Sequence, residues 1–118
     1  MSALHEHIFL LFYSVASAEG TVRKEEVYGV NLDLIKPWIE VEDHDQILEA
    51  WLTLQKQGVS SVMAFNKFRD YFNLNRRRFT KHLRHQLSEV CGAIAVAFAG
   101  NNKSELTLLA QLYFLFND

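Results

Sequence analysis

A chain of 118 residues is long enough to bury one hydrophobic core, and we expect it to form a single domain over residues 1–118. Its 49% of hydrophobic residues and 22% of charged residues exclude wholesale disorder. The formal net charge of −2 excludes a general electrostatic attraction to nucleic acid or to an anionic membrane.

The first predicted helix covers residues 4–15. Its apolar side chains recur at helical spacing and form one stripe: Leu4, Ile8, Leu11, Phe12 and Val15. The sequence Ala16-Ser17-Ala18 follows, and this small-x-small pattern also occurs where signal peptides are cleaved. Because no Lys or Arg precedes Ile8, we favour a helix end over a signal peptide, and we expect a cytoplasmic protein. The longest later apolar run, residues 91–100, is about half as long as a membrane-spanning helix.

A glycine turn and a second helix are predicted next. Gly20 lies where a left-handed residue would stop the first helix, since glycine adopts this conformation without strain. Thr21 is the predicted N-cap of the second helix. This helix continues through Leu34 to a break at Pro37.

Two further helices have clear starting signals. Asp43 with Gln46 forms a capping-box pattern and opens a helix that ends near Gly58. Ser60 or Ser61 caps the next helix. The apolar residues of that helix are Val62, Phe65, Phe68 and Phe72.

The longest predicted helix runs over residues 75–98, and the last covers residues 106–116. The core-facing stripe of the longest helix consists of Phe79, Leu83, Leu87, Val90 and Ile94. Gly100 and Asn101 end it, and Asn102 with Glu105 predicts a capping box for the last helix. The last helix is apolar on nearly every face, so we expect it at the centre of the core beside the first helix. The alternative is that a homodimer covers it.

Helical spacing throughout, a single proline and few alternating runs predict an all-α fold. The junctions at Gly20 and Gly100 look alike, because each has a glutamate five residues after the glycine, Glu25 and Glu105. We therefore expect a compact helical bundle with two pseudo-repeated helix-turn-helix units.

Residues 16–26, ASAEGTVRKEE, resemble the A-x-A-D-G-x-V-x-x-E-E signature of the TerB-like family. This family is known from tellurite-resistance proteins and from the membrane-distal part of some DnaJ-type co-chaperones. The resemblance implies a compact all-α domain with a metal-linked, scaffold-like role in stress response and no catalytic activity. The sequence departs from the family at Glu19, which replaces the motif's Asp, and at Ala99 and Asn102, which replace Asp and Val at the second junction.

The candidate metal ligands are Glu19, Glu25 and Glu26. Carboxylate oxygens bind divalent cations such as calcium or magnesium. The competing interpretation, which we favour, is that these carboxylates stabilise the start of a helix through its dipole. A second set, His82, His85 and Glu89, shares one helix face and has the ligand types of zinc, but neighbouring arginines would repel the cation.

Charge is divided along the chain. Residues 1–59 hold 4 Lys or Arg and 10 Asp or Glu, a net charge of −6, whereas residues 60–118 hold 8 and 4, a net charge of +4. This division indicates internal pairing or a polar interaction surface. Five basic residues lie opposite the apolar stripe of the longest helix: Arg77, Arg78, Lys81, Arg84 and His85. We predict that they bind an acidic protein or ligand; a merely solvated face is the alternative, and nucleic acid ranks last.

No pattern of catalytic residues stands out. Cys91 lies among apolar residues of a predicted helix, and neither a Gly-rich phosphate loop nor a glycine-framed serine occurs. We therefore predict a non-enzymatic interaction or scaffold module. The first alternative is a metal-responsive stress protein of the tellurite-resistance type, which binds a divalent cation at the turn over residues 19–25. A small enzyme ranks third.

Overall fold

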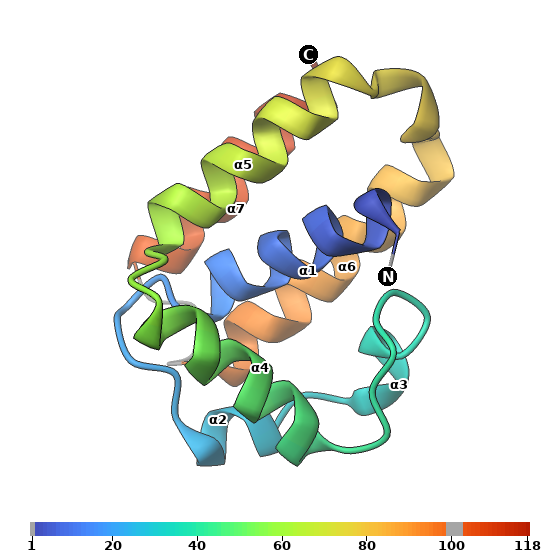
Figure 1. Cartoon of the computed structure of the whole chain (residues 1–118). Helices are drawn as coiled ribbons and strands as arrows, with labels where there is room; N and C mark the ends of the chain where they lie inside the picture. Colours follow the sequence, from blue (N-terminus) through green and yellow to red (C-terminus); the bar gives the residue numbers. More distant parts are fainter. Residues whose placement is uncertain (1, 99–102) are drawn as a thin grey trace.

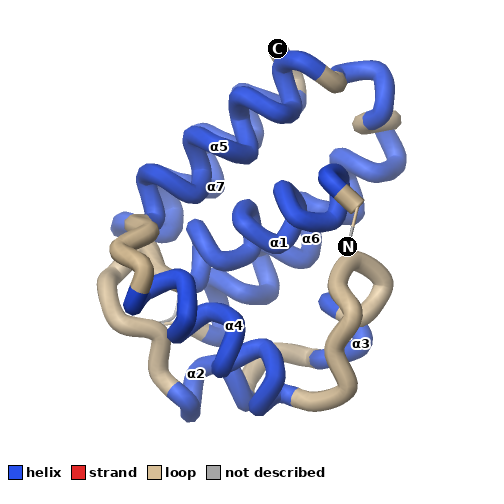
Figure 2. The backbone as a smooth tube through the Cα atoms, in the orientation of Figure 1, coloured by secondary structure: helices blue, strands red, loops and turns tan. Residues whose placement is uncertain are grey.

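The computed structural model describes residues 2–98 and 103–118, and every regular element within them is helical (Figure 1; Figure 2). The elements are α1 Ala3–Ala16, α2 Lys24–Tyr28, α3 Leu32–Ile35, α4 His44–Lys56, α5 Ser61–Leu74, the 3₁₀-helix η1 Arg76–Arg78, α6 Lys81–Ala97 and α7 Lys103–Phe116. The predicted all-α fold is confirmed. The predicted stop at Gly100 and Asn101, the Asn102 cap and the second pseudo-repeat junction lie outside the described residues.

The helix at the centre of the bundle is α1. It packs against α5, α6 and α7, and Figure 1 shows α5 and α7 alongside it with α6 behind. Its fully buried apolar side chains include Ile8, Leu11, Phe12 and Val15, so the predicted stripe is confirmed. The expectation that the last helix is central is wrong, because the first helix occupies that position.

The turn after α1 contains the predicted glycine. Gly20 has a φ of 118°, a conformation that favours glycine, although three residues separate it from the helix end at Ala16. The amide group of Gln55, in α4, holds this turn from the side. Its Nε2 donates to the Gly20 carbonyl at 2.9 Å, and its Oε1 accepts from the Val22 backbone N–H at 3.3 Å. A polar side chain of α4 therefore fixes the path of the loop.

The single helix expected up to Pro37 is wrong. The chain forms two short helices instead, α2 and α3, and the N-cap of α2 is Arg23 rather than Thr21. Gly29, a poor helix former, ends α2. Asn31 then starts α3 by accepting the backbone N–H of Asp33 at 3.0 Å. This hydrogen bond of the Asn31 side chain favours a new helix start over continuation of α2. The sequence-based prediction of one helix does not take this cap into account.

The caps of α4 and α5 agree with their sequence signals. Asp43 accepts the backbone N–H of Gln46 at 3.0 Å, and Ser60, rather than Ser61, accepts that of Met63 at 3.1 Å. Both helices therefore begin where predicted. Of the four apolar residues noted for α5, three are buried, whereas Val62 is 67% exposed.

The long helix does not begin at residue 75. Its N-cap is Thr80, whose Oγ1 accepts the backbone N–H of Leu83 at 3.1 Å. The preceding residue, Phe79, is 1% exposed and packs against Phe68 and Phe72 with ring centroids 5.7 and 5.0 Å away. Burial of this ring among the α5 aromatics accompanies a turn of the chain, which separates η1 from α6. The predicted core positions Leu87, Val90 and Ile94 of α6 are buried, and Leu83 is half-buried.

One face of α7 is buried and the other faces solvent. The buried face carries Leu108, Leu112 and Phe116. The opposite face leaves Leu106 50%, Tyr113 62% and Phe114 70% exposed. Among the described helices, none combines the length and hydropathy that a membrane crossing requires.

Candidate functional site

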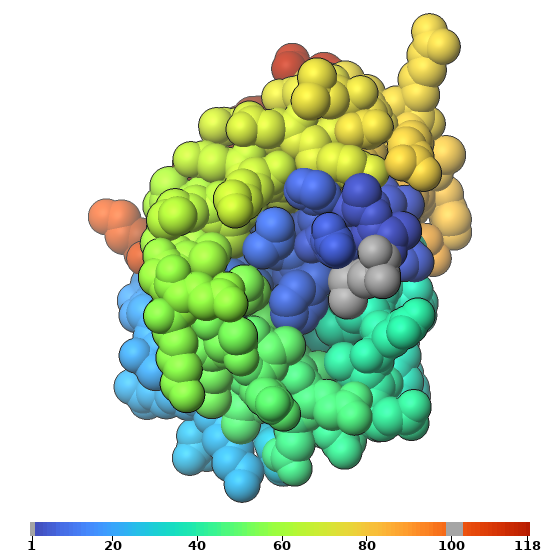
Figure 3. Space-filling model, viewed as in Figure 1, coloured from blue at the N-terminus to red at the C-terminus, as the bar shows by residue number. Residues whose placement is uncertain are grey.

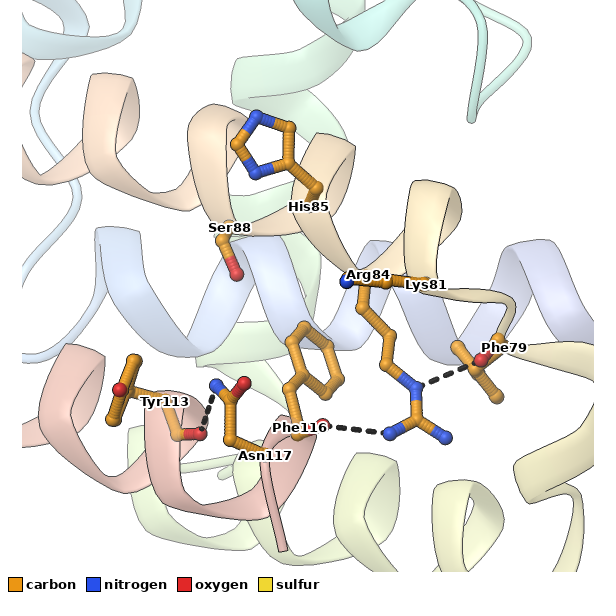
Figure 4. Close-up of a pocket in the computed structure, with 8 residues that line it drawn as sticks. All are labelled: Phe79, Lys81, Arg84, His85, Ser88, Tyr113, Phe116 and Asn117. Atoms are coloured by element: carbon orange, nitrogen blue, oxygen red, sulfur yellow. Dashed lines mark hydrogen bonds between the residues drawn. The ribbon is translucent and has the colours of Figure 1, made fainter.

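A cavity of about 620 Å³ lies between α6 and α7, and we call it the α6–α7 groove (Figure 4). One wall is formed by Lys81, Arg84, His85 and Ser88 of α6. The rest is formed by Phe79, Tyr113, Phe116 and Asn117. Three of the five predicted partner-binding residues therefore line a cavity whose other side is largely aromatic.

Arg84, predicted to bind a partner on the basic face of this helix, turns toward the protein instead. Its Nε donates to the Phe79 carbonyl at 2.8 Å, and its Nη1 donates to the Phe116 carbonyl at 2.6 Å (Figure 4). Its Nη2 approaches the Arg76 carbonyl at 3.4 Å, and the guanidinium lies 4.8 Å from the centre of the Phe72 ring. This side chain is partly buried and joins η1, the start of α6 and the end of α7. Its place at the C-terminal end of α7 is also the one that the helix dipole favours for a cation.

The other four residues reach solvent. Arg77, Arg78, Lys81 and His85 are exposed, and we call these four residues the basic surface. In Figure 3, one side chain from the segment after α5, coloured yellow, projects from the surface of the molecule. Arg78 donates to the Tyr71 hydroxyl at 3.1 Å. His85 lies 2.9 Å from the Glu89 carboxylate, so this pair is ionic only when the imidazole is protonated.

Among the described residues, no acidic side chain forms a salt bridge with Arg77, Arg78 or Lys81 of the basic surface, whereas His85 faces Glu89. The segment with Glu40, Glu42, Asp43 and Asp45 is exposed and lies at the opposite end of the molecule from η1 (Figure 1). Among the described residues, the salt bridges are Arg76 with Asp118 at 3.8 Å and His85 with Glu89. Both join residues of the second half of the chain. Of the two interpretations of the divided charge, internal pairing between the halves is therefore absent from the described part of the structure.

Sequence reasoning missed Tyr113, the most exposed aromatic residue of the groove. It is 62% exposed, whereas Phe79 and Phe116 are 1% and 5% exposed. The signal was present, because a helix that is apolar all round cannot bury every face against one layer of neighbours. The expectation that α7 is at the centre of the core leaves no face of this helix exposed, and it therefore does not predict Tyr113 in the groove.

The predicted metal ligands are only partly brought together. Glu19 and Glu26 line a second cavity of about 470 Å³, which Arg23 and Glu105 also line. Glu25 is exposed on α2 and does not line this cavity. Within residues 2–98 and 103–118, no group of three His, Cys, Asp or Glu side chains is placed to hold a metal ion.

Cys91 belongs to the core. Its side chain is completely buried, and this burial raises the pKa of the thiol far above its usual value. The nucleophilic thiolate is therefore negligibly populated at neutral pH. The prediction that Cys91 packs as a small hydrophobic residue is consistent with this position.

Comparison with family models, with curated proteins and with solved structures gives no significant match. The resemblance of residues 16–26 to the TerB-like motif therefore stays a prediction from one short segment, and the functional argument rests on the geometry of this chain.

Proposed function

We propose that this protein is a non-enzymatic interaction module whose basic surface binds an acidic segment of another protein. The observation that carries the proposal is the absence, among the described residues, of an acidic side chain paired with Arg77, Arg78 or Lys81. All three cations are exposed and keep their charge available to a partner.

The physical basis of the proposal is that the basic surface and an acidic partner have opposite charge, and not that these residues stabilise the fold. Exposed cations contribute little to folding, but they attract an acidic partner over roughly a Debye length, about 8–10 Å at physiological salt. Such charges mainly raise the rate of association and favour partners of opposite charge. Nucleic acid fits less well, because the protein as a whole carries a net charge of −2 and the basic surface is small.

The alternative, a divalent cation held by Glu19, Glu25 and Glu26, has weaker support. Glu25 lies outside the cavity that Glu19 and Glu26 share, and the Arg23 side chain lines that cavity. A cation there would meet a like charge.

The test compares two variants of equal net charge. The first replaces Arg77, Arg78 and Lys81 by Glu; the control replaces Lys36, Lys56 and Lys67, which are also exposed, by Glu. Fluorescence anisotropy with the labelled peptide EEDEFEDEE measures binding. We expect the first variant to weaken binding about tenfold or more and the control to weaken it about threefold or less.

Salt provides the second readout. Raising the NaCl concentration from about 50 to about 300 mM should weaken the wild-type complex markedly, since the pairs are exposed. No binding by the wild type, or equal weakening by the two triple variants, would contradict the proposal. The second outcome would mean that net charge alone attracts the peptide.

A further inference from the structure

We infer that the α6–α7 groove receives one large apolar side chain of the acidic segment, while the segment's carboxylates meet Lys81 at the edge of the groove. This inference rests on the proposed function and names the partner's chemistry: an acidic peptide with an aromatic or branched aliphatic anchor residue.

The aromatic side of the groove supports an apolar anchor mainly through Tyr113, because Phe79 and Phe116, which form its floor, are only 1% and 5% exposed. Phe79 and Phe116 belong to one aromatic cluster, in which each ring packs against Phe68 and Phe72. Their positions are therefore held by the core, and the floor does not have to be organised when a ligand arrives. Tyr113 stands beside them with 62% of its surface exposed. A partner that covers this ring removes apolar area from water, and tyrosine is one of the residues that most often dominate binding energy.

The edge of the groove selects acidic neighbours of the anchor. Lys81 lines the groove and has no carboxylate partner among the described residues, whereas His85, one helical turn later on α6, already faces the Glu89 carboxylate at 2.9 Å. Arg84, between them in the sequence, is committed to backbone carbonyls, and the described residues pair no carboxylate with its guanidinium. It therefore adds a fixed positive charge to the wall. An apolar floor inside a positive edge is complementary to an apolar residue flanked by carboxylates.

The size of the groove fits this occupant. Its volume of about 620 Å³ lies within the range of about 300–1,000 Å³ that is usual for ligand sites. Ser88 and Asn117 supply polar groups at its margin, where the peptide backbone of the segment can find hydrogen-bond partners (Figure 4). A second copy of this chain is the competing occupant, since its residues 38–45 combine apolar and acidic side chains.

Three peptides separate the contributions of charge and anchor. They are EEDEFEDEE, its Ala analogue EEDEAEDEE, and the neutral QQNQFQNQQ, all labelled at the N-terminus for fluorescence anisotropy. We expect the acidic peptide with Phe to bind about tenfold or more tightly than either of the other two.

A pair of variants on α7 locates the anchor. Tyr113→Ala should reduce the affinity for EEDEFEDEE to that for the Ala analogue. Leu106→Ala is the matched control, because Leu106 is 50% exposed on the same helix and does not line the groove, whereas Phe114 packs edge-on against the Tyr113 ring. Leu106→Ala should leave both affinities unchanged. Ser88→Trp, which fills the groove from α6, should likewise reduce the affinity for EEDEFEDEE to that for the Ala analogue. Because it leaves Tyr113 in place, it separates a loss of the groove from a loss of stability caused by Tyr113→Ala.

Each contrary outcome has a distinct meaning. Equal binding of the Phe and Ala peptides, with both lost in the Arg77, Arg78 and Lys81 variant, would overturn the anchor and leave the proposed function standing. Absence of binding by every acidic peptide would overturn both. Sedimentation velocity gives the last check: a dimer that Tyr113→Ala dissociates would assign the groove to a second copy and overturn the peptide as its occupant.

Discussion

At the C-terminal end of α7, the Arg84 guanidinium takes the place of water as hydrogen-bond donor to the backbone. It donates to the carbonyls of Phe79 and Phe116 and lies over the Phe72 ring. Its planar array of N–H groups suits several carbonyls at once, which a lysine ammonium does not reproduce. A residue that looks like part of a solvated basic stripe thus joins three segments of the fold.

Substitution of Arg84 should therefore be costly. We expect Arg84→Ala to lower the free energy of unfolding by about 2–4 kcal/mol, because charged hydrogen bonds are lost and a helix end is left without its donor. Arg84→Lys should restore only part of this. Urea denaturation followed by circular dichroism gives the values, with Lys81→Ala as the control at about 0.5 kcal/mol or less. Equal effects of Arg84→Ala and Lys81→Ala would show that the carbonyl bonds do not stabilise the fold.

Gly20 is the second residue whose conformation can be tested. Its φ of 118° strains any side chain with a Cβ, although no atom lies within 4 Å of the Cβ position. We expect Gly20→Val to destabilise the protein by about 1–2 kcal/mol and Gly20→Asn to be milder, since asparagine tolerates positive φ best. Denaturant midpoints measure both. Wild-type stability in the valine variant would rule out this turn geometry.

At the scale of elements, local hydrogen bonds determine where a helix begins. Which of its faces are exposed depends instead on how many other helices pack against it. The caps at Asp43, Ser60 and Thr80 each accept a backbone N–H three residues later. By contrast, α7 is apolar on both sides, and the bundle covers only one of them. The uncovered side supplies Tyr113 to the groove, which links the incomplete packing of this helix to its proposed role.

The interior of α6 contains a position that can be improved. Gly92 lies within Lys81–Ala97, and a Cβ there would meet no atom within 4 Å. Because glycine disfavours helix interiors, Gly92→Ala should stabilise the protein by about 0.5–1 kcal/mol. Thermal unfolding should show a higher Tm. Gly29→Ala is the control, since Gly29 is the C-cap of α2 rather than a helix-interior residue and its substitution should bring a smaller gain. A lower Tm for Gly92→Ala would mean that α6 packs differently around this residue.

The densest acidic segment of the molecule lies away from the basic surface. The acidic segment over residues 40–45 and the basic surface lie at opposite ends, with α1 and its neighbours between them (Figure 1). Separated poles orient the protein in the field of a charged partner before contact. The net charge of −2 does not reveal this arrangement, because the negative and positive charges largely cancel when they are added over the whole chain.

A cation titration tests the competing metal hypothesis at this scale. We expect calorimetry of chelator-treated protein with calcium or magnesium to give no saturable binding heat, because Glu19 and Glu26 share their cavity with Arg23. A saturable site that is lost in the Glu19→Gln, Glu26→Gln double variant, but kept in Glu40→Gln, would contradict this expectation and favour the metal-responsive alternative.

Local signals predicted much of the helical framework. The stripe of α1, the caps at Asp43 and Ser60 and the glycine turn at Gly20 depend on residues within a few positions of one another, so they are legible in the sequence. The start of α6 and the split at Asn31 were also encoded locally, by Thr80 and by Asn31 itself. At both positions the prediction follows the apolar periodicity across the boundary. In the structure, the capping residue determines where the helix begins.

What the sequence by itself determined is therefore an all-α chain, most of its helix starts, and a basic half joined to an acidic half. Only the tertiary structure decided which apolar helix is central, which face of α7 stays exposed, and that Arg84 turns inward while Arg77, Arg78 and Lys81 face solvent. The physical reason is distance along the chain: Arg84 meets the carbonyl of Phe116, 32 residues away, and no local pattern records such a partner. Burial and charge compensation depend on those remote neighbours, and so does the α6–α7 groove.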